Sequence, residues 1–273
     1  MKTNLTVLFG LFVLTTTVFA ARPPSAVRAP GEDYRDKIIQ HSYESFPVFG
    51  YTGDPDHTGG ATAVETAKEL SKINLNTVEV WPADKDFKAH FASIRDERLS
   101  ILDPSFPRRS TWLYPDDGCF ARAELSSVRT QAMRLPAPSK IFVFGNLNVA
   151  TANSPEGSVS WWYHVVIGYR VQNVVYVVDP AIDPSGPLKL EVWLDKMGDR
   201  NQMKVAFCSA GAFEPYSQCR GAESMTLEEA ADSQSNFLSV EWHRLTQLGR
   251  DPNKELGDSP PWNIKEALRI FLN

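Results

Sequence analysis

The chain is organised around the stretch Pro115-Asp116-Asp117-Gly118-Cys119-Phe120-Ala121-Arg122-Ala123. Asp-Asp-Gly is typical of a turn, and from Phe120 apolar residues recur at helical spacing as far as Met133. Cys119 is therefore predicted in the first turn of a helix, where backbone N–H groups and the helix dipole favour a thiolate and can hold an oxyanion. This position suits a nucleophile, although a lone free cysteine is more often a small buried residue.

The N-terminus is predicted to be a secretory signal peptide over residues 1–20. Met1 and Lys2 come shortly before an apolar run from Leu5 to Phe19, and small residues surround the expected cleavage site after Ala20. No later segment is apolar for long enough to cross a membrane. We therefore expect a secreted or periplasmic protein that has no membrane contact once the signal peptide is cleaved.

Length and composition are suited to one large domain or one domain with appendages, since 42% of the 273 residues are hydrophobic. The net charge of −5 and the absence of a basic run argue against a nucleic-acid partner. Residues 21–76 are rich in Pro and Gly and are predicted to form an N-terminal arm or a removable pro-segment. Residues 77–250 are then the catalytic domain and residues 251–273 a C-terminal extension, with helical patterns at 63–73, 86–99 and 226–249.

The three cysteines have different expected roles in an exported protein. Cys208 and Cys219 lie close together in a loop with Gly, Ser and Pro, and in an oxidising compartment they can form a disulfide. Cys119 is then the odd thiol, either a reactive nucleophile, an inert buried residue or one half of an intermolecular bridge. Its place at a helix start favours the nucleophile.

Two β-prone runs, residues 161–169 and 174–179, predict a hairpin joined by residues 170–173. If Tyr169 pairs with Val174, His164 lies opposite Asp179 on the same face, with Cβ atoms roughly 5 Å apart. Asp179 would hold one imidazole nitrogen protonated, and the other nitrogen would take the thiol proton of Cys119. A one-residue slip would separate the pair, because no Asn-Gly or Asp-Gly fixes the register. Taken singly, such histidines and aspartates are more often structural.

Other chemistries lack their sequence motifs. The five histidines are scattered, and neither His-Glu-x-x-His nor Cys-x-x-Cys occurs, so no metal site is expected. Neither a Gly-x-Ser-x-Gly motif nor a phosphate-binding or dinucleotide-binding glycine pattern is found, so no cofactor is expected. The order Cys, His, Asp, with the cysteine on a helix and the other two residues on strands, is instead the layout of papain-like and transglutaminase-like thiol enzymes.

Five motifs in addition resemble the secreted bacterial protein glutaminases, which deamidate glutamine side chains in intact proteins. The motifs are residues 114–123, Phe144-Gly145-Asn146-Leu147, Trp162-Tyr163-His164-Val165, Val178-Asp179-Pro180 and Ser185-Gly186-Pro187. The resemblance implies an α+β fold in which the helix carrying the nucleophilic cysteine packs on an antiparallel sheet, as in transglutaminase-like and papain-like cores. It also implies that Cys119 is the nucleophile, His164 the base and Asp179 the orienting residue, and that a pro-region blocks the site.

The expected function is that of a protein-glutamine glutaminase. Cys119 would attack the amide, ammonia would leave, and water would hydrolyse the thioester to give glutamate. We expect a monomer that acts on proteins or peptides with exposed glutamine. Trp161, Trp162 and Tyr163 are expected either to line the mouth of the site or to pack the strand.

Four alternatives stay open on the sequence alone. A cysteine peptidase, a transglutaminase or a toxin-like deamidase would use the same Cys-His-Asp triad. A secreted binding module without catalytic activity would instead have a buried Cys119 and a structural His–Asp pair.

Overall fold

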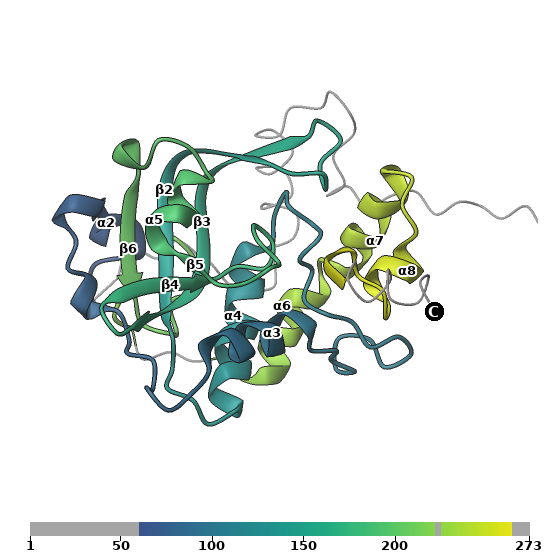
Figure 1. Cartoon of the computed structure of the whole chain (residues 1–273), viewed down its shortest axis with the longest axis horizontal. Helices are drawn as coiled ribbons and strands as arrows, with labels where there is room; N and C mark the ends of the chain where they lie inside the picture. The colour runs from purple at the N-terminus through teal and green to yellow at the C-terminus, as the bar shows by residue number, and fades with distance from the viewer. Residues whose placement is uncertain (1–59, 222–224, 264–273) are drawn as a thin grey trace, which may run out of the picture.

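A six-stranded antiparallel sheet forms the centre of the structure, a computed structural model that describes residues 60–221 and 225–263 (Figure 1). The strand order is β1-β6-β2-β3-β4-β5. The strands are β1 (Lys68–Glu69), β2 (Ser139–Ala150), β3 (Ser158–Val171), β4 (Val174–Val178), β5 (Leu188–Lys189) and β6 (Lys204–Cys208). The α-helices are α2 (Ala63–Thr66), α3 (Phe87–Asp96), α4 (Cys119–Ala132), α5 (Leu190–Asp195), α6 (Leu227–Ser235), α7 (Leu238–Gln247) and α8 (Pro252–Leu256). The predicted signal peptide lies outside the described residues.

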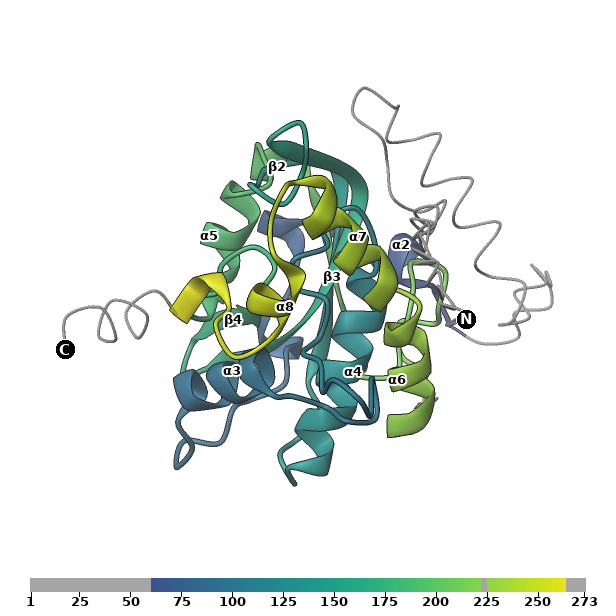
Figure 2. The same ribbon diagram turned by 90° about the vertical axis from the view of Figure 1, so that its right-hand side faces the viewer.

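Helices cover both faces of the sheet, because strand side chains point alternately to the two sides. On one face, residues at the start of α4 pack against Phe142 and Val165 of the central strands. On the other face, Trp193 of α5 packs against Val143 and Val166. Figure 2 shows α4 and α6 on one side of the sheet and α5 on the other. This confirms the predicted α+β class, with the cysteine helix packed on an antiparallel sheet.

The start of α4 is set by Gly118. This residue has φ 82°, a left-handed conformation that favours glycine, and it caps the helix that begins at Cys119. A Cβ atom at Gly118 would also lie 3.0 Å from the ring of Phe237. Backbone conformation and packing therefore both require glycine here, and Cys119 lies in the first turn of the helix, as the sequence predicts.

The register of the β3–β4 hairpin differs from the prediction. Tyr169 pairs with Tyr176 and not with Val174, and only Gln172 and Asn173 connect the strands. The reason is that Gln172 takes a positive φ of 57°, so that a two-residue turn forms without glycine. Because the shift is an even number of residues, the predicted faces are kept. Pairing with β4 covers only residues 167–171 of β3, and the edge of residues 158–166 has no partner among the described strands on that side.

A bulge in β2 changes the alternation of side chains along β3. Phe144 pairs with Tyr163 and Leu147 with Trp161, so two residues of β2 lie opposite one residue of β3. In a regular strand Trp161 and His164, three residues apart, would point to opposite faces. Here their rings stack, with centroids 4.9 Å apart and planes at 13°.

Residues on both sides of the predicted catalytic domain, residues 77–250, pack against the rest of the structure. The helix predicted for residues 63–73 is wrong after Thr66, because the chain then forms β1 and pairs with β6. Ala63 of the predicted arm is fully buried. At the other end, Leu256 of the predicted extension packs in a core cluster with Leu113 and Leu245. Whether part of the arm is removed stays a prediction, and residues 21–59 lie outside the described part.

The segment from Thr111 to Asp116, just before α4, is buried although it is neither helix nor strand. Irregular backbone can be buried only if its polar groups find partners. Arg122 of α4 supplies donors: its Nη1 lies 3.3 Å from the carbonyl oxygen of Thr111, 3.1 Å from that of Tyr114 and 2.8 Å from that of Asp117.

Helix α7 supplies further partners to the same segment. The backbone N–H of Leu113 donates to Oε1 of Glu241 at 3.0 Å. Arg244 forms a buried ion pair with Asp116. The loop that leads into Cys119 is thus held from both α4 and α7.

Replacing Arg122 by methionine tests this arrangement, because it keeps the aliphatic stem and removes the donors. We expect the free energy of unfolding to fall by about 3 kcal/mol, since buried carbonyl groups lose their partners. Arg129 lies on the same helix as Arg122 and forms a partly exposed ion pair with Glu97, the residue after α3. The matched variant Arg129→Met should therefore lose less than about 1 kcal/mol of unfolding free energy. Urea unfolding followed by circular dichroism gives both values, and equal losses would contradict the role of Arg122.

Candidate active site

Cys119 is a buried free thiol at the start of α4. Its thiol lies near the side chains of His164 and Tyr163, which are neighbours on β3, and this contact raises the pKa of both groups. Neighbouring residues of a strand point to opposite faces of the sheet. A single thiol can therefore contact the side chains of both most readily from the edge of the strand. The part of β3 that β4 leaves uncovered provides such an edge.

His164 is held by Asp179, the first residue after β4. The Nε2 atom of His164 and the Oδ2 atom of Asp179 are 2.9 Å apart, and both side chains are almost completely buried. Because an ionised carboxylate only accepts hydrogen bonds, Nε2 carries the proton and Nδ1 is left for the thiol of Cys119. The structure therefore brings the predicted pair together, although across a diagonal of the hairpin and not as directly opposed residues.

Two tryptophans fix the imidazole and its partner. Trp161 stacks on the ring of His164 and donates from Nε1 to the carbonyl oxygen of Pro115 at 3.0 Å. This bond ties β3 to the turn before Cys119. From the other side of the pair, Trp193 donates from Nε1 to Oδ2 of Asp179 at 2.8 Å.

The charges of the pair stabilise one another against the cost of burial. Burial alone would lower the pKa of His164, but the charge and hydrogen bond of Asp179, and then the contact with Cys119, raise it to about 9. Burial would likewise raise the pKa of Asp179, but His164, Trp193 and the charge of Arg122 lower it. The carboxylate is therefore ionised at neutral pH and the imidazole can hold a proton.

Tyr163 is partly buried and packs against the core cluster that includes Phe144 and Val165, and it also lies near the thiol of Cys119. Burial, followed by the negative charges of Cys119, Asp117 and Glu214, raises the pKa of Tyr163 well above its ordinary value of 10. Its hydroxyl therefore stays protonated and can donate to the sulfur atom. Trp162, the third aromatic residue of the motif, is largely exposed and lies further out.

Sequence reasoning did not find Trp193 and gave Arg122 no role. Trp193 belongs to a short amphipathic segment, and nothing in that segment points to Asp179. Arg122 is part of the cysteine motif, but its bonds to the preceding loop depend on how that loop folds. The predicted disulfide between Cys208 and Cys219 is confirmed.

Two negative findings concern the described ranges 60–221 and 225–263. None of their helices is long and apolar enough to cross a membrane. Their His, Cys, Asp and Glu side chains nowhere gather in a group of three that could hold a metal ion.

Comparison with known proteins points to one family. Residues 87–197, which include Cys119, His164 and Asp179, match a family model described as glutaminase. This match confirms the resemblance to the protein glutaminases that the sequence motifs predict. No match was found among curated proteins.

Solved structures of protein-glutaminase are also similar. One crystal structure has 22% identity and a TM-score of 0.46, over 58% of this chain and 89% of that chain. The solution structure of protein-glutaminase from Chryseobacterium proteolyticum has 21% identity and a TM-score of 0.43, over 58% and 88%. A crystal structure of pro-protein-glutaminase has 21% identity and a TM-score of 0.44, over 63% and 64%.

Replacing Asp179 by asparagine should lower the pKa of His164 from about 9 to near or below its ordinary value of 6.5. The reason is that the carboxylate charge, which raises this pKa, is removed, while burial, which lowers it, remains. NMR titration of the imidazole C–H signals measures this pKa. His90 is an internal control in the same spectrum, since its pKa is lowered to about 4 by burial alone. A titration of His164 that does not change in the variant would rule out Asp179 as its partner.

The same pair makes stability depend on pH in a defined direction. A histidine whose pKa is raised on folding stabilises the fold fully below pH 6.5, and this contribution is lost as the pH rises through about 9. The difference in unfolding free energy between pH 6 and pH 9.5 should therefore be smaller in Asp179→Asn than in the unchanged protein. Urea unfolding at the two pH values compares them, and equal differences would contradict this coupling.

Proposed function

We propose that this chain, whose residues 87–197 match the glutaminase family, hydrolyses the side-chain amide of glutamine residues in proteins or peptides. The products are ammonia and a glutamate residue. The observation that carries the proposal is that His164 is held by the buried Asp179 carboxylate at 2.9 Å while contact with the Cys119 thiol contributes to raising its pKa. The base thus lies between a nucleophile and an orienting group, as a thiol mechanism requires.

The first half of the reaction forms a thioester. His164 takes the thiol proton, and the sulfur of Cys119 bonds to the amide carbon of glutamine while the carbonyl oxygen becomes an oxyanion. The start of α4 presents backbone N–H groups, including that of Cys119, which are suited to hold this charge. His164 then gives the proton to the amide nitrogen, the C–N bond breaks and ammonia leaves.

The second half returns the enzyme to its starting state. His164 takes a proton from water, the oxygen attacks the thioester carbon and the C–S bond breaks. The sulfur regains a proton and the product is glutamate. Asp179 keeps the imidazole oriented throughout, and the Tyr163 hydroxyl is placed to donate to the sulfur. Trp161 holds the ring in position, and Trp162 lies at the mouth, where a substrate would contact it.

The same proposal places the enzyme outside the cytoplasm. Its first twenty residues have the pattern of a signal peptide. The disulfide between Cys208 and Cys219 is a bond that persists mainly in oxidising compartments. An enzyme of this kind would meet folded or partly folded proteins there, and it would need no cofactor.

Ammonia release from intact casein tests the function. The full-length and proteolytically trimmed protein should release ammonia, and Cys119→Ala should reduce the rate by at least about 10³-fold without loss of the fold. New N-termini and lysine crosslinks are measured in the same samples. Ammonia without either product is the expected outcome.

Each other outcome contradicts the proposal in a specific way. New N-termini without ammonia would make the protein a cysteine peptidase, and crosslinks would make it a transglutaminase. Undiminished turnover by Cys119→Ala would exclude the cysteine as nucleophile. No product from any form, on casein or on glutamine peptides, would leave a binding module as the better interpretation.

A further inference from the structure

We propose that Trp162, Tyr216 and Glu214 form a recognition subsite that binds a lysine or arginine side chain next to the target glutamine. The three residues are called the aromatic–acidic subsite below. This inference rests on the proposed function, because it names the substrates that the site would prefer.

Two exposed aromatic rings lie next to one another, and one of them packs on Tyr163. Trp162 and Tyr216 are each 47% exposed, the highest values among the large hydrophobic residues that the structure describes. Their ring centroids are 6.2 Å apart. Trp162 in turn packs on Tyr163, with ring centroids 4.7 Å apart, and Tyr163 lies near Cys119, whose contact raises the pKa of the Tyr163 hydroxyl. The exposed pair therefore continues outward from the reacting sulfur.

The charge beside these rings is negative. Glu214 is half-buried, and burial raises the pKa of its carboxyl group above the ordinary value. The charges of Glu214 and Asp117 both act on the hydroxyl of Tyr163, so both carboxylates lie near it. Among the described residues no Lys, Arg or His forms an ion pair with Glu214. A cationic side chain of the substrate would offset the free-energy cost of burying the charge of Glu214. It would also lie against aromatic faces, which attract cations.

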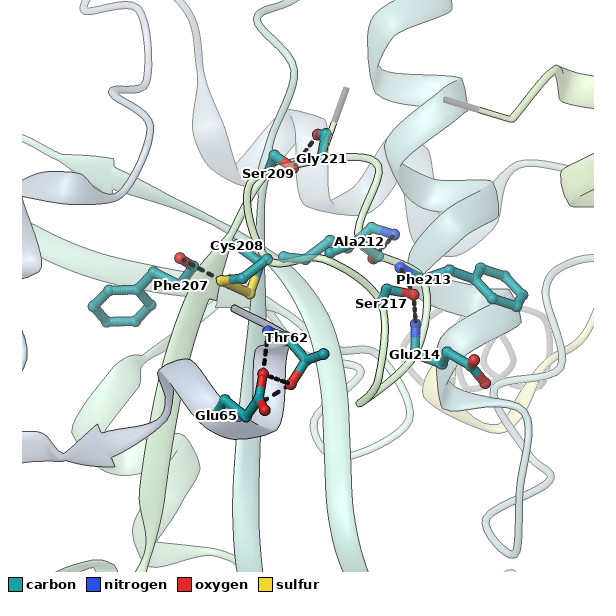
Figure 3. Close-up of a disulfide and its surroundings, with 12 residues drawn as sticks. Thr62, Glu65, Phe207, Cys208, Ser209, Ala212, Phe213, Glu214, Ser217 and Gly221 are labelled. Atoms are coloured by element: carbon teal, nitrogen blue, oxygen red, sulfur yellow. Dashed lines mark hydrogen bonds between the residues drawn. A yellow bond between two sulfur atoms is a disulfide. The ribbon is translucent and has the colours of Figure 1, made fainter. Parts of the chain in front are cut away.

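The loop that carries Glu214 and Tyr216 is fixed before any substrate binds. The disulfide between Cys208 and Cys219 closes it at its base, as Figure 3 shows. Inside the loop, Oγ of Ser217 accepts from the backbone N–H of Phe213 at 3.2 Å and of Glu214 at 3.0 Å. A site that needs no ordering on binding loses less affinity to conformational entropy.

Phe213 attaches the loop to the catalytic helix. In Figure 3 the side chains of Phe213 and Glu214 point away from the disulfide. The ring of Phe213 meets that of Phe120, the residue after Cys119, with centroids 5.0 Å apart. The position of the subsite relative to the thiol is therefore set by packing. The loop also lies outside residues 87–197, so these contacts belong to this chain beyond the region that the family model matches.

Three peptides that differ only beside a single glutamine test the subsite. They carry arginine, leucine or glutamate next to the glutamine, and ammonia release gives kcat/KM for each. We expect the unchanged protein to prefer arginine over leucine by roughly 3- to 10-fold through a lower KM, and to disfavour glutamate. In Glu214→Gln and in Tyr216→Ala the arginine-to-leucine ratio should fall towards one, whereas Asp84→Asn, an exposed carboxylate before α3, should keep it.

An arginine-to-leucine ratio near one in the unchanged protein, or an unchanged ratio in both variants, would overturn the subsite. A preference for leucine would do the same and would indicate apolar recognition. Calorimetry on the Cys119→Ala protein measures peptide binding without turnover. If no peptide releases ammonia but this protein binds the arginine peptide more tightly than Cys119→Ala/Glu214→Gln does, the proposed function fails and the subsite stands.

Discussion

A buried segment without regular structure must find a partner for each of its backbone polar groups, and residues 111–116 impose this condition on the rest of the molecule. Arg122 meets it from within the helix that the segment leads into, by donating to carbonyl groups of Thr111, Tyr114 and Asp117. Helix α7 contributes Glu241 and Arg244. Because the same helix carries Cys119 at its first position, the bonds that allow the loop to be buried also fix the sulfur atom.

The length of β4 is the second condition on the site. The strand ends at Val178, which pairs with Ile167, and Asp179 is the first residue outside the sheet. The part of β3 before Ile167 therefore has an open edge on this side. Three of the four residues 161–164 of β3 then meet at the candidate site, since Trp161 stacks on the imidazole of His164 and Tyr163 lies near Cys119. The bulge in β2 opposite this stretch is what allows Trp161 and His164 to stack.

Sequence reasoning succeeded where the cause was local and failed where it was distant. A turn before apolar helical spacing was enough to predict the start of α4, and the period of two in a strand was enough to predict that His164 and Asp179 share a face. The register was wrong because a positive φ at Gln172 has no sequence signal as clear as Asn-Gly. Trp193, Tyr216 and Glu214 could not be assigned, because their relation to the site depends on α5 and a disulfide loop far along the chain.

Two buried histidines show that burial alone does not decide whether an imidazole can carry a charge. The ring of His90 packs against that of Trp81. Burial lowers the pKa of His90 to about 4, so this imidazole stays neutral. His164 is at least as buried and also stacks on a tryptophan, yet its pKa is raised to about 9. The difference is Asp179, whose charge more than offsets the cost of desolvating an imidazolium. A buried imidazole that can gain and lose a proton therefore requires a nearby carboxylate. Of the two histidines, His164 has such a partner in Asp179, at the end of β4.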